Sequence, residues 1–195
     1  MASDSFIEIE HKFLIPADFD RDGFLRAVKN LSPTRQAKIN VRDTYYVLGH
    51  DKTRVFRHRF DSEIQQLTVK SVEGDAAVRT EVNLPIDQSA GDQRATVAKF
   101  MQELGSCWSG EISKEIDVSY FADCEVVLYR ASNTRDSVWC VEFEAISPAG
   151  VAEGLRTLEK YEKALGFLTT QRESRSLFEL LVLGQAPDNI KKMFH

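Results

Sequence analysis

The sequence lacks long apolar segments: no run of about 18 apolar residues, the length of a membrane-spanning helix, occurs in it. It also lacks a charged and then apolar N-terminal segment with a cleavage site, which would mark a secreted protein. We therefore expect a soluble, cytoplasmic protein with no membrane partner.

Cysteine is scarce as well. The three cysteines, Cys107, Cys124 and Cys140, are odd in number and lack metal-site spacing, so we expect free thiols of a reducing compartment. The net charge of −5 argues against a nonspecific nucleic-acid binder, which should be basic. A glycine-rich phosphate loop is missing, so any phosphate recognition would rest on side chains. The sequence has no nucleophile elbow or Cys/His pairing that would suggest covalent catalysis.

What the sequence does contain is a long series of short strands. Period-two patterns predict strands over 6–15, 38–48, 54–61, 63–72, 78–86, 111–121, 125–131 and 138–146. Helical spacing predicts helices near 18–31, 92–104 and 148–165 and an amphipathic stretch over 174–183, followed by a frayed tail after Gly184. A hairpin turn is predicted at 73–75. About eight mostly hairpin-connected strands, about four helices and no linker predict one α+β domain over 1–195, and eight strands suffice to close a small barrel.

The first strand places Glu8, Glu10 and Lys12 on one face and apolar residues on the other. Side chains two residues apart on a strand stand about 6.5–7 Å apart, so the glutamates repel by roughly 2.4 kcal/mol at an effective dielectric near 20. Water screens that repulsion on an open surface, whereas an enclosed site needs a cation, and a hard divalent metal is the natural one. The pattern leaves both interpretations open: a solvated face, or one wall of a charged cavity.

The later strands carry charges sorted by sign, which is unlike an ordinary solvated face. The cations that share strand faces are Lys12, Arg57, Arg59, Lys70, Arg79 and Lys114. The carboxylates are Glu8, Glu10, Glu81, Glu142 and Glu144. One carboxylate pair thus lies near each end of the chain, with most cations between. His11 and His58 fall on the opposite strand faces, where we expect them to pack in the core or against helices.

These motifs resemble those of a known family. Glu8-Ile9-Glu10-His11-Lys12 is similar to the E-x-E-x-K opening of the CYTH family, whose fold is called the triphosphate tunnel. The later elements follow in the family's order: Arg57-His58-Arg59, Lys70, Arg79-Thr80-Glu81, Lys114, Glu142-Phe143-Glu144 and Glu173-Ser174-Arg175-Ser176. The resemblance covers about 6–183. It implies a closed, antiparallel eight-stranded barrel with a charged lumen open at both ends, flanked by about four helices.

The resemblance also implies a function: a hydrolase of inorganic triphosphate or of a small organic triphosphate such as thiamine triphosphate, dependent on Mg²⁺ or Mn²⁺. The implied metal ligands are Glu8, Glu10, Glu142 and Glu144. The implied triphosphate-binding residues are Lys12, Arg57, Arg59, Lys70, Arg79, Lys114 and Arg175, and the catalytic ones are Glu8, Glu10 and Lys12. Two alternatives remain open: a class IV adenylyl cyclase making cyclic AMP from ATP, and a non-catalytic polyphosphate-binding domain. The expected state is a monomer or homodimer.

The chain departs from the family pattern at three positions. Ile116 stands where the family often has a second basic residue, which predicts one phosphate contact fewer. Tyr129 lies in the region where the family tends to place an aspartate, so that a metal ligand would be missing or supplied elsewhere, with Asp136 as the candidate. Leu177 replaces the aromatic residue of the closing signature.

Overall fold

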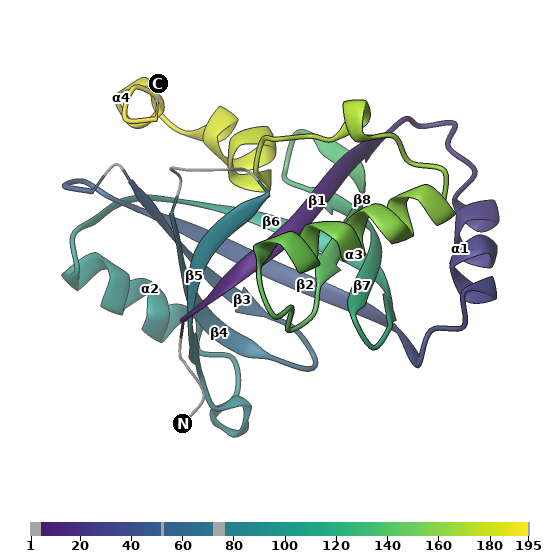
Figure 1. Ribbon diagram of the computed structural model, residues 1–195. Coiled ribbons are helices and arrows are strands. Elements are labelled where there is room, and N and C mark those ends of the chain that lie inside the picture. Colours follow the sequence, from purple (N-terminus) through teal and green to yellow (C-terminus); the bar gives the residue numbers. More distant parts are fainter. Residues whose placement is uncertain (1–4, 52, 72–76, 195) are drawn as a thin grey trace.

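A computed structural model describes residues 5–51, 53–71 and 77–194 of the chain (Figure 1). Eight antiparallel strands close into a barrel in the order β1-β5-β4-β3-β2-β6-β7-β8. Their bounds are β1 Ser5–Ile15, β2 Arg35–Leu48, β3 Arg54–Phe60, β4 Gln65–Ser71, β5 Val78–Pro85, β6 Ser106–Tyr120, β7 Cys124–Ser132 and β8 Ser137–Ala145. The predicted α+β class and the closed antiparallel barrel are confirmed.

Strand β1 closes the barrel by pairing with two different neighbours. Its first half lies opposite β5, with Glu8 across from Arg79, and its second half lies opposite β8, with Glu10 across from Glu144. Because side chains alternate along a strand, one set from β1 points into the barrel and the other packs outside. The strand therefore connects the cation-rich strands of the middle of the chain to the glutamate-rich β8.

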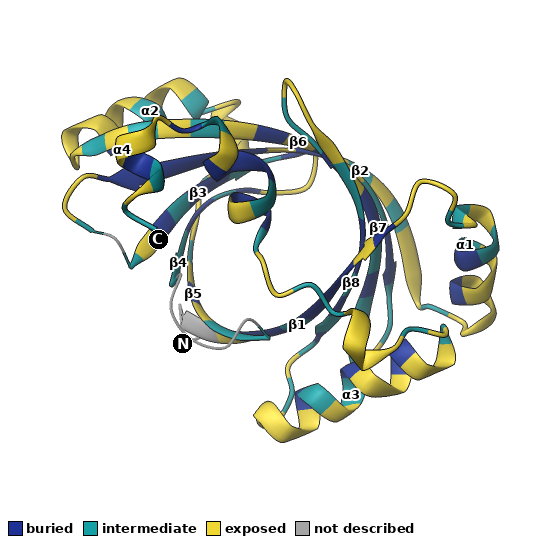
Figure 2. Cartoon of the chain, turned by 90° about the horizontal axis from the view of Figure 1, so that it is seen from above, coloured by how far each residue is buried: buried dark blue, intermediate teal, exposed yellow. Residues whose placement is uncertain are grey.

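The longer helices lie outside the barrel, as the view from above shows (Figure 2). They are α1 (Arg21–Asn30), which begins after the capping side chain of Asp20, α2 (Arg94–Glu103) and α3 (Val151–Ala164). An apolar cluster under α1 and α3 holds the outward side chains of β1, β7 and β8, with the rings of Phe13 and Phe143 edge to face at 5.8 Å. A second cluster packs Met101 of α2 against Leu67 and neighbours. This outer packing fixes which strand faces turn inward.

The C-terminal segment packs against inward-facing residues at one end of the barrel. Its π-helical turn spans Phe178–Val182, and the short helix α4 spans Asp188–Lys191. Phe178 and Leu181 join the buried cluster that contains Tyr45 and Ile112. The prediction of a frayed tail after Gly184 was wrong, because buried Ile190 and the ring of Phe194, 5.1 Å from that of Phe178, anchor it.

The strand boundaries differ from the predicted ones mainly in β2 and β6. These two strands pair from Arg35 opposite Tyr120 to Leu48 opposite Ser106, so β6 begins five residues before the predicted start at 111. The predicted hairpin turn at 73–75 and Val72, the predicted end of β4, lie outside the described residues. Of the helices in the described part of the chain, none has both the length and the apolar character needed to cross a bilayer.

Candidate functional site in the barrel lumen

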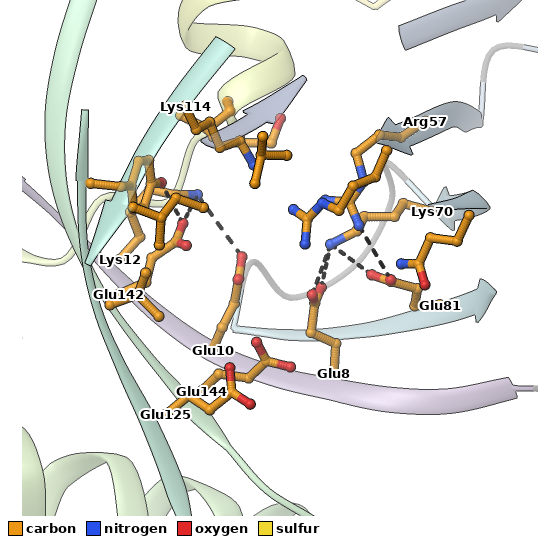
Figure 3. A pocket seen from close by; sticks show the side chains of 18 of the residues that line it. Glu8, Glu10, Lys12, Arg57, Lys70, Glu81, Lys114, Glu125, Glu142 and Glu144 are labelled. Atoms are coloured by element: carbon orange, nitrogen blue, oxygen red, sulfur yellow. Dashed lines mark hydrogen bonds and ion pairs between the residues drawn. The ribbon is translucent and has the colours of Figure 1, made fainter. Parts of the chain in front are cut away.

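The barrel encloses a cavity of about 380 Å³ whose lining is dominated by charge (Figure 3). Ten of the eleven residues predicted for the site line it: Glu8, Glu10, Lys12, Arg57, Arg59, Lys70, Arg79, Lys114, Glu142 and Glu144. In the close-up, Lys12 and Lys114 lie on one side of an open middle and Arg57 and Lys70 on the other, with Glu10, Glu125 and Glu144 along one wall. The charged strand faces therefore turn inward, which decides between the two interpretations of the pattern.

The alternation of β1 explains how so much charge is held inside. Ile9 and Phe13 point outward into the packed cluster and are 2% and 1% exposed. A register slip by one residue would turn these apolar side chains into the charged lumen and the charges into the apolar cluster. His11, on the same outward face, contacts Glu162 of α3, and His58 is buried on the outer face of β3, so the predicted packing of both histidines is confirmed.

The first charged group is centred on Lys70. Its ammonium lies 2.7 Å from a carboxylate oxygen of Glu8 and 2.7 Å from one of Glu81. Arg57 lies 3.5 Å from the other oxygen of Glu81. Burial by itself would raise the pKa of the Glu81 carboxyl, but Lys70 and Arg57 outweigh it and hold that pKa below its usual range. Here the carboxylates neutralise and orient two cations.

A second group forms around Asp43, which is not among the residues predicted for the site. Asp43 is fully buried on β2, and its carboxylate lies 2.6 Å from the ammonium of Lys114 and 3.2 Å from Nε of Arg59. Burial would raise the pKa of Asp43, but Lys114, Arg59 and Arg57 hold it well below its usual range. Asp43 thus fixes the direction of two cations that face the cavity.

The third group holds Lys12. Its ammonium lies 3.3 Å from Glu142, 3.9 Å from Glu10 and 3.4 Å from the main-chain oxygen of Arg175. The hydroxyl of Tyr129 donates to Glu142 at 2.7 Å. Burial, together with the charge of Glu142, raises the pKa of the Tyr129 phenol well above its usual value, so that it remains a donor. Glu142 is therefore held by two partners within the protein.

The fourth group consists of carboxylates alone. Glu144 lies directly opposite Glu10 on β1 and opposite Glu125 on β7. Within the described ranges neither Glu125 nor Glu144 forms an ion pair, and the contact of Glu10 with Lys12 is long. Burial, and then the charges of Glu8, Glu10 and Glu125, raise the pKa of Glu144 well above its usual value. Directly opposed like charges destabilise a sheet, so this wall carries repulsion that the other groups do not.

The remaining predicted residues lie elsewhere or at the edge. The Arg175 side chain is 58% exposed and pairs with Glu173 at 2.7 Å, outside the described lining of the cavity. Arg79 lines the cavity and donates to the main-chain oxygen of Ser174 at 3.4 Å. Asp136 lies in the turn between β7 and β8, away from the lumen, whereas Ile116 lines the cavity. Among the described residues, no three ligating side chains converge closely enough to hold a metal ion as they stand.

Two charged residues of the candidate site, Asp43 and Glu125, were not predicted from the sequence. Both had a usable signal. Asp43 shares the face of β2 that carries Val41 and Tyr45, and a lone carboxylate amid apolar side chains indicates a buried partner. Glu125 shares the face of Val127 and Tyr129, and its place at the start of β7 made it resemble an exposed strand end.

Solved structures with the same fold support this description of the barrel. A protein of Pyrococcus horikoshii OT3 is 17% identical, with 89% of this chain and 99% of that chain covered and a TM-score of 0.72. A Hippeastrum protein described as having a dominant triphosphatase activity is 15% identical, with 93% and 97% covered and a TM-score of 0.63. A chain of the Schizosaccharomyces pombe Mediator head module is 12% identical, with 83% and 95% covered and a TM-score of 0.60. At these identities the likeness concerns the fold alone.

The sequence itself identifies the family. None of the curated proteins matches this chain. The CYTH domain model, in contrast, matches residues 7–177, which include strands β2 to β8 and all of β1 except Ser5 and Phe6. The chain therefore belongs to the CYTH domain family.

Proposed function

We propose that this protein is a divalent-metal-dependent hydrolase of triphosphate compounds. The CYTH family includes triphosphatases and adenylyl cyclases, which act on triphosphate substrates and typically use divalent metals. The observation that carries the proposal is the arrangement of the cations. Lys12, Lys114, Arg57 and Lys70 face one cavity from opposite sides, so that a polyanion between them meets a cation on either flank (Figure 3).

The cations would bind and orient the phosphates. Arg57 and Arg59 share a face of β3, and planar guanidinium groups grip phosphate oxygens with two donors each. The buried Nε of Arg57 has no hydrogen-bond partner among the described residues, so it can donate to a ligand. Hydrolysis joins a water oxygen to the terminal phosphorus and breaks its bond to the bridging oxygen, and the diphosphate leaves with the electron pair. The fixed cations would stabilise the charge that develops on those oxygens.

The donor set of the carboxylate wall fits a hard divalent cation. Glu10, Glu125 and Glu144 supply only oxygen donors, and their repulsion is what such a cation relieves. Of the ligands that the resemblance implied, Glu8 and Glu142 are instead engaged by Lys70 and Lys12. We therefore propose that Glu10, Glu125 and Glu144 would hold Mg²⁺ or Mn²⁺, which would supply positive charge to the phosphate oxygens and activate a water molecule.

The decisive experiment follows the products. Purified protein is incubated with Mg²⁺ or Mn²⁺ and either inorganic triphosphate or ATP. Release of orthophosphate supports the hydrolase, whereas cyclic AMP with pyrophosphate would identify a cyclase. Tight binding of triphosphate without turnover under either metal would identify a polyphosphate-binding domain. A double variant, Arg57→Ala with Arg59→Ala, serves as the control for contaminating phosphatases, because it should lose the activity.

A further inference from the structure

Glu162 of α3 is a buried carboxylate outside the barrel, apart from the four charged groups of the lumen, and it is 2% exposed. One of its carboxylate oxygens contacts Nδ1 of His11 on β1, and the other accepts a hydrogen bond of 2.6 Å from the guanidinium of Arg172. Burial by itself would raise the pKa of Glu162, but His11 and Arg172 outweigh it and hold that pKa below its usual range. An ionised carboxylate therefore joins a helix, a barrel strand and the chain that follows the helix.

Arg172 begins a crossing segment, residues 172–179, that runs from α3 over one end of the barrel. In Figure 1 this segment belongs to the yellow-green chain that follows α3. β5 pairs with the first half of β1, whereas the crossing segment bonds to its second half. Arg172 forms an antiparallel bridge with Phe13, and the amide of Glu173 donates to the main-chain oxygen of Lys12 at 2.7 Å. The start of the crossing segment is thus fixed to the strand that carries Lys12.

The crossing segment also contacts two cations of the lumen through its main chain. The oxygen of Arg175 accepts from the ammonium of Lys12, and the oxygen of Ser174 accepts from the guanidinium of Arg79, both at 3.4 Å. The next four residues line the cavity: Ser176, Leu177, Phe178 and Glu179. A shift of the crossing segment would therefore move the acceptors of Lys12 and Arg79 and change the directions of both side chains.

We infer that Glu162 is a positioning residue for triphosphate binding. Through Arg172 it holds the crossing segment against β1, and the main-chain oxygens of the segment then direct Lys12 and Arg79 toward the triphosphate. Without the Glu162 carboxylate, the Arg172 guanidinium would keep only a longer contact of 3.8 Å with exposed Glu159, and a partly buried cation without a close partner is costly. This inference rests on the proposed function, because it assumes that these cations bind the triphosphate.

The test measures the dissociation constant of inorganic triphosphate for metal-free protein by calorimetry. Glu162→Gln keeps the size of the side chain and removes its charge, and it should raise the constant by about fivefold or more. Arg172→Gln removes the other partner at a position that is 23% exposed, where folding is less at risk, and it should raise the constant by a similar factor. The double variant should bind no more weakly than either single variant, because both act through one contact.

Glu159→Gln is the matched control. Glu159 lies on the same helix and contacts the same guanidinium, but it is 59% exposed, so its loss should change the constant by less than about twofold. Circular dichroism shows whether each variant is folded, and if Glu162→Gln is not, Arg172→Gln decides the question alone.

A second comparison separates positioning from a general loosening of the fold. In a Lys12→Met background one of the two cations through which Glu162 acts is absent, so the factor caused by Glu162→Gln should be at least about twofold smaller. An equal factor in both backgrounds would overturn the inference, and so would a folded Glu162→Gln variant that binds as the unaltered protein does. In both cases the proposed function stands, because the unaltered protein still binds triphosphate. If the unaltered protein does not bind it, the proposed function itself fails and the inference with it.

Discussion

The two sets of carboxylates on the inward strand faces behave differently although they surround the same cavity, which Glu8, Glu81, Glu125 and Glu144 line and behind whose lining Asp43 is buried. Glu8, Glu81 and Asp43 each lie within 2.6–2.8 Å of a lysine ammonium. Glu125 and Glu144 lie opposite each other on neighbouring strands without an ion pair in the described part of the chain. Both sets are glutamates and aspartates on barrel strands, so residue type alone does not separate them.

The difference shows what each set is suited for. A carboxylate held by a lysine lowers the cost of burying that lysine and fixes its direction, which prepares a site for an anion. A group of carboxylates without neighbouring cations keeps its negative charges unbalanced. Such a group is suited to bind a positive ion from solution. The barrel thus separates a prepared anion site from a cation site within one cavity, and the two can be disturbed independently.

The largest effect should come from the carboxylate wall. Glu144→Gln keeps the size of the side chain and removes its charge, so turnover at limiting Mg²⁺ or Mn²⁺ should fall by about 100-fold or more. In the metal-free protein the same change removes a like charge opposite Glu10 and Glu125 and should raise the free energy of unfolding. Rates over a metal titration and denaturant unfolding without metal measure the two effects.

Glu81→Gln is the matching variant in the other set. Glu81 is held by Lys70 and Arg57 and is 2% exposed, so loss of its charge leaves buried cations less balanced and should lower the free energy of unfolding of the metal-free protein. Changes of the same sign in both variants would contradict the distinction between the two sets. Full activity of Glu144→Gln at limiting metal would remove Glu144 from the metal site.

A smaller effect is expected from the prepared anion site. Replacing both Arg57 and Arg59 with alanine should raise the dissociation constant of inorganic triphosphate by about tenfold or more, because charged hydrogen bonds contribute roughly 1.5–3 kcal/mol each. Calorimetry on metal-free protein separates this loss from metal binding. The control is Arg175→Ala, whose exposed side chain pairs with Glu173 and should leave the constant nearly unchanged. Equal constants for the double variant and the unaltered protein would exclude the two arginines from the site.

The strands and the inward charges were predictable because alternation is a local property of the sequence. Glu8 and Glu10 alternate with Ile7 and Ile9, so a sequence window of a few residues suffices to place them on one face. Whether that face pointed into a lumen was not decided by the residues; the family resemblance supplied it. The closed strand order, together with the presence of Glu8 and Glu10 in the lining of the cavity, confirms it.

The pairing of charges was not predictable in the same way. Lys70 contacts Glu8, 62 residues away in sequence, and Lys114 contacts Asp43, 71 residues away. Barrel closure and strand tilt determine which inward-facing residues lie at the same height along the barrel axis and can therefore pair. Glu8 and Glu10 look equivalent in the sequence, yet only Glu8 has a close lysine partner, whereas Glu10 is 3.9 Å from Lys12. Helix α4 was not predicted for a related reason. Ile190 and Phe194 are isolated apolar residues in a polar segment of the sequence, and the surface against which they pack forms only when the barrel folds.

The smallest predicted effect concerns the protonation of Lys114 in the prepared anion site. Burial lowers the pKa of Lys114 to about 8; Asp43 opposes the shift, and Arg59 and Arg57 add to it. As pH rises through 8 the native protein loses this charge while the unfolded chain keeps it up to about 10.5. In that interval the contribution of Lys114 to the free energy of unfolding rises with pH, and its contribution to triphosphate binding falls. The dissociation constant of inorganic triphosphate for metal-free protein should therefore increase above pH 8, by at most about tenfold per pH unit.

Lys114→Arg is the matched variant, because a guanidinium stays charged throughout this range. Any change in the ionisation of triphosphate itself affects the variant and the unaltered protein equally. Calorimetric constants for both proteins between pH 7 and 9.5 should diverge above pH 8, and parallel curves would mean that the Lys114 ammonium keeps its proton beside Asp43.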